Sequence, residues 1–426
     1  MNNQNKPKVY FKTFGCRTNL FDTQVMINSL SDFSHTPYEE ESDIVVVNSC
    51  TVTNGADSGV RNYVNRLQNE GKRIYFTGCG VKTQGKELFD KGLVFGVFGH
   101  SLKEKINELL NAKDSFLDEG NLNSLDSTII TEFVGKSRAF IKIQEGCDFA
   151  CSYCIIPSVR GKARSFELKK ILEQINILSQ NGFSEFILTG TNMGSWGKDI
   201  GEDLSTLIKE ICQIDGVVRL RLGSLEPSQI NESFLELLDN NKIERHLHIA
   251  LQHTSPFMLK LMNRQNTYEK DLELFNFLAQ KGFALGSDYI IGHPQESEEV
   301  WQEALENFKA LPITHLHSFI YSKRDNTKSA LLKADVPGNI ARIRKQMLEQ
   351  ITKDNNFTLR KKLEKNKTPL KVLIEDVKEN KEGFILLGLD EYYNKIEIHS
   401  QNFFKKDTWL EIKHFNAKED KNYAEI

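Results

Sequence analysis

The first third of the chain alternates short apolar runs with segments of helical character. The runs cover residues 8–14, 43–48 and 72–77, and a helix is predicted over 57–69. Alternating β and α elements form a parallel, doubly wound sheet. In such sheets ligands collect beyond the carboxyl ends of the strands. The pattern therefore predicts both the fold of this region and the edge at which its functional side chains should lie.

A cysteine follows each of the three runs: Cys16, Cys50 and Cys79. All three are expected at the same edge of the sheet, where Gly15 would let the backbone turn sharply beside a bulky group. Buried cysteines often behave as small apolar residues, and Cys212 is interpreted in that way. Three cysteines in one topological position instead favour a ligand set, and we predict a 4Fe–4S cluster there.

A second cysteine set has the spacing C-x3-C-x2-C, at Cys147, Cys151 and Cys154. A structural zinc site needs four protein ligands, but no fourth cysteine is near and histidine is absent from residues 101–245. Three thiolates suit a 4Fe–4S cluster whose fourth iron stays open to a small molecule. The triplet therefore predicts an iron–sulfur centre that binds a ligand.

Length and composition indicate a large cytoplasmic enzyme with no membrane partner. The 426 residues exceed what one hydrophobic core usually organises, so two or three domains are expected. No run of about 18 apolar residues occurs, and residues 1–8 lack the apolar centre of a signal peptide. Cysteines in ligand-like spacing fit a reducing compartment. With a formal net charge of −3, contact with nucleic acid must rely on local basic patches.

Three domains are predicted. Residues 1–125 form the first α/β domain, a polar stretch over 113–137 is interpreted as a linker, and residues 138–365 alternate β and α again. The second domain has strand candidates at 139–144, 185–189, 217–222, 246–251, 285–291 and 315–319, with helices such as 167–180 and 296–309 between them. Six βα units are fewer than the eight of a closed barrel, so we predict an α/β fold with a partial (β/α)6 barrel at its centre.

The third predicted domain, residues 366–426, is expected to form a small β-barrel. Its β-type runs lie at 370–374, 384–389 and 395–399. Just before it, residues 342–367 hold nine Lys and Arg against three acidic residues. Such a run is usually a solvated helix face, but it is also a candidate contact for phosphate.

The C-x3-C-x2-C triplet, with Tyr153 directly before its last cysteine, resembles that of the radical S-adenosylmethionine (SAM) enzymes, which are built on partial barrels. In that superfamily the open iron chelates SAM, and the reduced cluster cleaves SAM to a 5′-deoxyadenosyl radical. Segments at the expected strand ends resemble the SAM-contacting motifs of the superfamily. The resemblance implies these cofactor-binding residues: Tyr153, Gly190, Asn192, Ser224, Glu226, Gln252 and Ile290.

With the amino-terminal domain included, nearly the whole chain resembles the methylthiotransferases, which end in a small RNA-binding β-barrel called TRAM. Residues 142–148 and 154–161 look most like the branch that modifies N6-threonylcarbamoyladenosine in tRNA. Other branches act on N6-isopentenyladenosine in tRNA or on an aspartate of a ribosomal protein. The chain departs from the family at His293 and Gln295, where Phe and Gly are usual, and at residues 253–254, where Ser-Gly is usual.

The resemblance implies two 4Fe–4S clusters. Cys147, Cys151 and Cys154 (the radical triplet) would generate the radical from SAM. Cys16, Cys50 and Cys79 (the auxiliary triplet) would hold the sulfur that is donated. One SAM would methylate that sulfur, and a second would allow its insertion at adenine C2, a position without an acidic proton for a general base.

The implied partners are a tRNA anticodon stem-loop, a sulfur donor, and a reductant such as flavodoxin or ferredoxin. Arg160, Lys162 and Arg164 follow the radical triplet and are candidate contacts for substrate phosphate or carboxylate, although a surface role is nearly as well supported. Two alternatives remain open: the same chemistry on a ribosomal protein, and a non-catalytic iron–sulfur RNA-binding protein, against which the intact SAM motifs argue.

Overall fold

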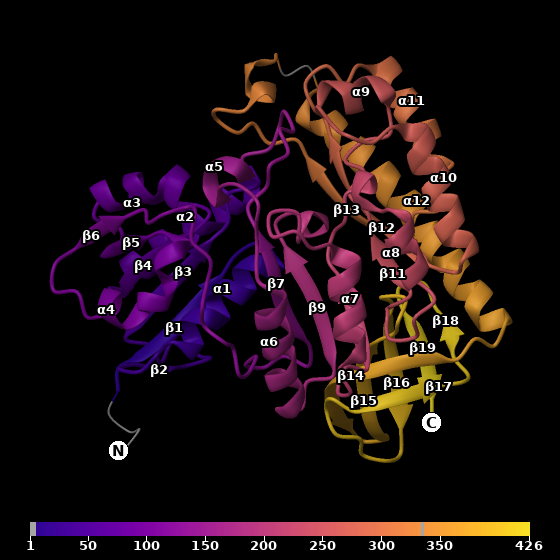
Figure 1. Cartoon of the computed structure of the whole chain (residues 1–426), viewed down its shortest axis with the longest axis horizontal. Helices are drawn as coiled ribbons and strands as arrows, with labels where there is room; N and C mark the ends of the chain where they lie inside the picture. Colours follow the sequence, from indigo (N-terminus) through magenta and orange to yellow (C-terminus); the bar gives the residue numbers. More distant parts are fainter. Residues whose placement is uncertain (1–5, 334–335) are drawn as a thin grey trace.

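The computed structural model describes residues 6–333 and 336–426, and three regions follow one another along the chain (Figure 1). At the amino terminus, parallel strands form a six-stranded sheet in the order β2-β1-β3-β4-β5-β6. The bounds are Lys8–Thr13 (β1), Ser34–His35 (β2), Ile44–Ser49 (β3), Arg73–Gly78 (β4), Gly96–Phe98 (β5) and Phe116–Asp118 (β6). The three runs predicted from the sequence are β1, β3 and β4, so the prediction of a parallel sheet is confirmed.

Helices cover both faces of this sheet. They are α1 (Arg17–Asn28), α2 (Asn54–Asn69), α3 (Lys86–Asp90) and α4 (Ile106–Leu110), with a π turn at Val81–Gly85 and a 3₁₀ turn at His100–Lys105. Alternate residues of β3 supply two separate cores: Val45 and Val47 pack on the face that α2 covers, and Ile44 and Val46 pack on the other. The sheet is therefore buried on both sides, as a doubly wound fold requires.

The polar stretch over 113–137 is more structured than the linker expected from its composition. It contains β6. Ile130 and Phe133 are buried in the apolar cluster of the central region, and Asp126 is only 9% exposed. These few buried residues lie among exposed polar ones, so the average composition of the segment does not reveal them.

The central region is a partial barrel. Its parallel strands are β7 (Ala139–Glu145), β9 (Glu185–Gly190), β10 (Arg219–Leu222), β11 (His246–His248), β12 (Ala284–Ile291) and β13 (His315–Ile320). Isolated bridges from Leu220 to Ile243 and from Leu225 to Ile249 join the sheet of β7, β9 and β10 to the sheet of β11, β12 and β13. The (β/α)6 prediction is confirmed. Strand β11 is shorter than predicted because the chain bends after it, with Gln252 at a positive φ of 69°.

Helices follow the barrel strands, and a short strand, β8 (Arg164–Ser165), pairs antiparallel with β7. The helices are α5 (Ile156–Arg160), α6 (Leu168–Gln180), α7 (Leu204–Gln213), α8 (Glu232–Leu237), α9 (Pro256–Leu261), α10 (Tyr268–Gln280) and α11 (Glu298–Lys309). Helix α1 of the first region also packs here, because its Phe21 and Val25 belong to the apolar cluster of the barrel. The first two regions therefore share a core.

The long helix α12 (Gly338–Lys365) leads to a curled sheet at the carboxyl terminus (Figure 1). The strands are β14 (Leu370–Asn380), β15 (Gly383–Leu389), β16 (Lys395–Ser400), β17 (Trp409–Ile412), β18 (Asn416–Ala417) and β19 (Asn422–Glu425), in the order β17-β14-β15-β16-β19-β18. All neighbours are antiparallel except β16 and β19. The predicted small β domain is thus present as a half-barrel. Within 6–333 and 336–426, no helix is long and apolar enough to cross a membrane.

The three regions meet at one tyrosine. Tyr393, in the turn between β15 and β16, stacks on His246 of β11 with 5.1 Å between the ring centroids, and the guanidinium of Arg221 lies 5.2 Å from the same ring. Arg17, at the start of α1, donates a hydrogen bond to the Tyr393 hydroxyl at 3.0 Å. The half-barrel therefore touches both the barrel and the amino-terminal domain.

Candidate functional site

The auxiliary triplet lies at the carboxyl edge of the amino-terminal sheet, as predicted. Cys16 follows β1 and caps α1, and Cys50 and Cys79 directly follow β3 and β4. Gly15, at a φ of +95°, packs so tightly that a Cβ added to it would lie 2.6 Å from the Cβ of Cys50. A side chain there would push Cys50 out of position. All three cysteines carry free thiols.

The three thiols influence one another electrostatically. Burial raises the pKa of the Cys50 thiol to about 11, a hydrogen bond from the backbone of Val52 opposes this rise, and Cys79 and Cys16 reinforce it. Burial also raises the pKa of Cys79, while the guanidinium of Arg160 acts in the opposite direction. A bound positive centre would therefore be needed to hold these groups as thiolates.

The radical triplet lies in the loop between β7 and α5. Its sulfur atoms accept hydrogen bonds: Cys147 Sγ from the N–H of Phe149 at 3.4 Å and from Asn192 Nδ2 at 3.5 Å, and Cys151 Sγ from Arg264 Nη1 at 3.8 Å. Donors aimed at sulfur stabilise the negative thiolate form. Burial raises the pKa of Cys154 to about 12, so this thiol requires a bound cation to ionise.

Ser152 anchors the loop of the radical triplet. Its N–H donates to the carbonyl of Met262 at 3.0 Å, and its carbonyl accepts from the N–H of Ser329 at 2.8 Å. Its hydroxyl lies 3.0 Å from the carbonyl of Leu261 and 2.9 Å from the Ser329 hydroxyl. The loop is thus fixed before any ligand binds.

Sulfur spacing favours clusters over single ions. In the parts of the chain that the structure describes, the groups whose ligand atoms all lie within 4.8 Å of one another are His248, Asp288 and His317, and Asp22, Asp126 and Glu145. Neither cysteine triplet is that compact. A zinc ion bound at about 2.3 Å would draw its thiolates to within roughly 4 Å of each other, whereas a four-iron cluster holds them further apart. Both triplets therefore fit a 4Fe–4S cluster better than zinc.

The seven residues predicted to contact SAM lie at the carboxyl ends of barrel strands or in the adjoining loop. Tyr153 and Ile290 share an apolar cluster with Met258 and Met262. Ser224 donates to Asp288 at 3.2 Å, and Glu226 forms an ion pair with Arg264. The remaining three are Gly190, Asn192 and Gln252.

Gly190 is tightly confined. A Cβ added to it would lie 3.0 Å from the carbonyl oxygen of Gln144. Gln144 in turn accepts a hydrogen bond from the N–H of Asn192 at 2.8 Å. Because this N–H is held, Asn192 can direct its own side chain toward Cys147.

Comparison with known proteins assigns the chain to a family. Residues 8–99 match the model of the uncharacterized protein family UPF0004, and residues 141–308 match that of the radical SAM superfamily. Over 419 residues the chain is 54% identical to a Helicobacter pylori J99 protein whose name describes it as a methylthiotransferase without a substrate; the match covers 98% of this chain and 99% of that protein. The chain belongs to the radical SAM methylthiotransferases. It is therefore an enzyme that uses SAM and two 4Fe–4S clusters.

More distant methylthiotransferases have names that include a substrate. An Aquifex aeolicus protein named threonylcarbamoyladenosine tRNA methylthiotransferase MtaB is 35% identical over 81% of this chain and 87% of its own length. A Fervidobacterium nodosum protein named tRNA-2-methylthio-N(6)-dimethylallyladenosine synthase is 30% identical over 83% of this chain and 85% of its own length. The solved structure of the radical SAM methyltransferase TsrM from Kitasatospora setae matches 76% of this chain and 75% of that chain with a TM-score of 0.57 at 16% identity, which supports the fold.

Arg160, the first of the basic residues that follow the radical triplet, is buried among polar side chains. Arg160 is only 2% exposed and contacts Asp22, Glu145, Asn19 and Cys79. Neither the substrate contact nor the surface role expected for Arg160 is seen. The sequence places Arg160 beside the cysteine loop. It does not indicate that residues of the amino-terminal domain would contact this side chain.

Three of the four departures from the family pattern, His253, Thr254 and His293, are buried in this methylthiotransferase, whereas Gln295 is exposed. His293 and His253 are both fully buried. His293 Nε2 lies 2.7 Å from the Ser329 hydroxyl, which also contacts Ser152 in the loop of the radical triplet. Gln295 has a φ of +70°, a conformation that favours the glycine usual there. His293 therefore supports the loop rather than facing a substrate.

The basic run over 342–367 is only partly engaged within the protein. Arg344 and Arg360 are buried and contact Glu296 and backbone carbonyls of residues 418–419. Lys353 and Lys361 form ion pairs with Glu419 and Glu364. Among the described residues, four basic side chains of the run are exposed and form no ion pair, so the run remains a candidate contact for phosphate: Arg342, Lys362, Lys365 and Lys367.

Proposed function

We propose that this methylthiotransferase acts on tRNA, adding a methylthio group to C2 of N6-threonylcarbamoyladenosine beside the anticodon to give 2-methylthio-N6-threonylcarbamoyladenosine. One contact carries the proposal: Arg160, which ends α5 after the radical triplet, donates to Cys79 Sγ of the auxiliary triplet at 3.2 Å. Two ligand sets joined in this way can serve one substrate atom. Relatives named for threonylcarbamoyladenosine, at 35% and 32% identity, support this base over dimethylallyladenosine, whose named synthases reach 30%.

Each triplet supplies three thiolates to one 4Fe–4S cluster in this proposal. When bound, the clusters provide the reductive cleavage of SAM and the sulfur for transfer, respectively. The protein's own contribution is to fix the thiols. Gly15 leaves room for Cys50, and Asn192 and the N–H of Phe149 orient Cys147.

SAM is proposed to bind across the carboxyl ends of the barrel strands. Tyr153 and Ile290 offer an apolar surface for its adenine. The Ser224 hydroxyl is suited to the ribose hydroxyls, and the Glu226 and Arg264 ion pair is suited to the charged methionyl end. Gly190, Asn192 and Gln252 complete the set.

The substrate adenine is proposed to enter beside Asp288. Burial raises the pKa of this carboxyl, but His248 and His317 outweigh that effect and hold the pKa well below its usual range. Asp288 is therefore a permanent acceptor, able to take an N–H from a base or its N6 substituent. A nucleotide in a single-stranded anticodon loop can be splayed out toward this carboxylate at a small unstacking cost.

The division of labour follows the three regions: residues 1–125 hold the auxiliary triplet, 138–365 bind SAM, and 366–426 bind the anticodon stem-loop. A flavodoxin or ferredoxin would supply electrons, and a separate donor would supply sulfur. Because Arg342, Lys362 and Lys365 of α12 are exposed, we place phosphate contacts on this helix as well as on the half-barrel.

Mass spectrometry of tRNA nucleosides from cells with and without the gene tests the substrate. We expect 2-methylthio-N6-threonylcarbamoyladenosine to disappear on deletion and its unmodified parent to accumulate. Loss of a methylthio-isopentenyl nucleoside, or of a methylthio-aspartate in a ribosomal protein, would assign another substrate instead. Purified protein that forms no 5′-deoxyadenosine under reduction would refute the enzymatic assignment of these cysteines altogether.

A further inference from the structure

Arg160 occupies an unusual position for an arginine. Its guanidinium is fully enclosed and uses every nitrogen: Nε donates to Cys79 Sγ at 3.2 Å, Nη1 to Asp22 at 2.7 Å and to Glu145 at 2.5 Å, and Nη2 to Asn19 at 2.5 Å. A side chain this specifically held has one orientation. The N–H aimed at sulfur is therefore a fixed feature of the protein.

The surrounding charges balance without the thiol. Three carboxylates, from Asp22, Asp126 and Glu145, face three cations, from Lys103, Lys142 and Arg160. Burial and the nearby Arg160 cation lower the pKa of His100 to about 3, so this neighbour of Glu145 is neutral. A thiolate at Cys79 adds a negative charge, and Arg160 is the member of this network whose charge contacts it directly.

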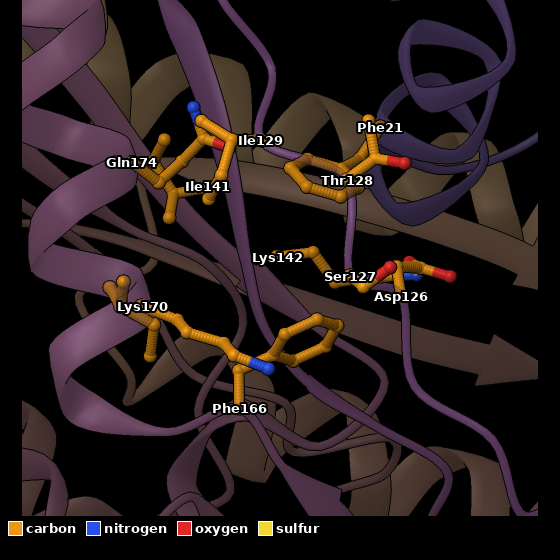
Figure 2. Close-up of a pocket in the computed structure, with 11 residues that line it drawn as sticks. Phe21, Asp126, Ser127, Thr128, Ile129, Ile141, Lys142, Phe166, Lys170 and Gln174 are labelled. Atoms are coloured by element: carbon orange, nitrogen blue, oxygen red, sulfur yellow. The ribbon is translucent and has the colours of Figure 1, made fainter. Parts of the chain in front are cut away.

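This buried group is closed to larger ligands. Figure 2 shows Lys142 extending past Phe21 and Phe166 toward Asp126, and its Nζ lies 5.3 Å and 5.6 Å from the centroids of those rings. The cavity beside them has a volume of about 30 Å³, enough for roughly one water molecule. The charges therefore act on the protein itself rather than on a substrate.

Arg160 also belongs to the loop of the radical triplet. It ends α5, six residues after Cys154, and the carbonyl of the next residue, Gly161, accepts a hydrogen bond from the N–H of Cys147 at 3.1 Å. The residue that contacts Cys79 is thus tied to the first cysteine of the other triplet. Displacing it would shift the two thiol sets relative to each other.

Hydrogen bonds and positive charge at a cluster thiolate stabilise the more negative, reduced state and so raise the reduction potential. Resting on the proposed function of the auxiliary triplet, we propose that Arg160 is a positioning residue that raises the reduction potential of the auxiliary cluster through Cys79. The same side chain keeps that cluster in register with the loop of the radical triplet.

Two charge-balanced pairs of substitutions test this role in the full chain. Arg160→Gln with Asp22→Asn removes the contact with Cys79 and one carboxylate. Lys103→Gln with Asp126→Asn is the matched control, because it removes one cation and one carboxylate from the same network but no contact with a thiol. Arg160→Lys keeps the positive charge and serves as a second test variant in case the first double variant fails to fold.

All three are made in a Cys151→Ala background so that only the auxiliary cluster remains, and its midpoint potential, iron content and electron paramagnetic resonance spectrum are measured. We expect a more negative potential and an altered spectrum in both Arg160 variants, with smaller or no change in the control. Loss of iron from both Arg160 variants, with iron kept in the control, would show that Arg160 retains the cluster rather than tunes its potential, and would overturn the proposal. An unchanged potential in both Arg160 variants, or an equal shift in the control, overturns it.

A parent protein that binds no iron at this site refutes the auxiliary cluster itself, and the inference falls with it. That outcome is distinct from a parent that binds iron but whose midpoint potential does not change when Arg160 is replaced. In otherwise unaltered chains, the Arg160 variants should also form 5′-deoxyadenosine with less methylthio product per SAM cleaved than the control pair.

Discussion

Replacing Lys142 with methionine should destabilise the protein by about 3 kcal/mol. Lys142 is fully buried, and its ammonium lies 2.7 Å from Asp22, 2.5 Å from Asp126 and 2.9 Å from Glu145. Removing one partner of a buried ion pair costs about 3–5 kcal/mol, because the remaining charge is left uncompensated. Here each carboxylate keeps a second cation from Lys103 or Arg160, so the lower end of that range applies.

The assay is a urea titration of the cluster-free full chain, followed by tryptophan fluorescence. Trp196 reports on this region because its indole N–H donates to the carbonyl of Phe166 at 2.9 Å. Lys169→Met, at an exposed position on α6, is the control and should change stability by less than about 0.5 kcal/mol. Adding Asp126→Asn to Lys142→Met should restore part of the loss, since it removes one unpaired carboxylate.

A loss below about 1 kcal/mol for Lys142→Met, or no recovery in the double variant, would contradict the view that these charges stabilise the interface as a balanced set. A loss similar to that of Lys169→Met would have the same meaning.

Three further outcomes are expected. Cys151→Ala should abolish formation of 5′-deoxyadenosine while iron stays at the auxiliary triplet; near-normal SAM cleavage would remove Cys151 from the radical site. Cys50→Ala should still cleave SAM but form no methylthio nucleoside, and wild-type yields of that product would show that Cys50 is a core residue. Burial raises the pKa of Asp271 to about 7, so ionising this carboxyl destabilises the folded protein. The loss of stability develops as pH rises from about 4 to 7. Asp271→Asn should therefore stabilise the protein at pH 8 by up to about 4 kcal/mol, since a tenfold change in proton affinity is worth about 1.4 kcal/mol, and have little effect at pH 4; equal effects at both pH values in urea titrations would contradict this.

Local periodicity made most of the fold predictable. The strands over 44–49 and 73–78 contain the apolar runs 44–47 and 74–76, and such runs are typical of parallel strands buried on both faces. The cysteine positions followed from the same topology. Strand β11 was overpredicted because apolar residues continue to Leu251, while the bend at Gln252 depends on backbone geometry that no periodicity reveals.

The environment of the charges could not be predicted. Arg160 and Lys142 are residue types usually found at protein surfaces. They are buried here because oppositely charged residues from other segments pair with them. Asp22 lies about 120 residues before Lys142 in the chain, and no local sequence pattern indicates that these two residues pair. Such partners are set by tertiary contacts between domains, which local sequence patterns do not record.

The position of Tyr393 gives the half-barrel a structural role in addition to the expected RNA contact. This ring covers His246 and Arg221 near the amino ends of the barrel strands, opposite the ends that carry the cysteine loops. The carboxyl-terminal domain thus completes the packing of the barrel strands at this end. A truncated enzyme would expose His246 and Arg221, which are now buried, so the part of the chain expected to hold RNA also stabilises the barrel.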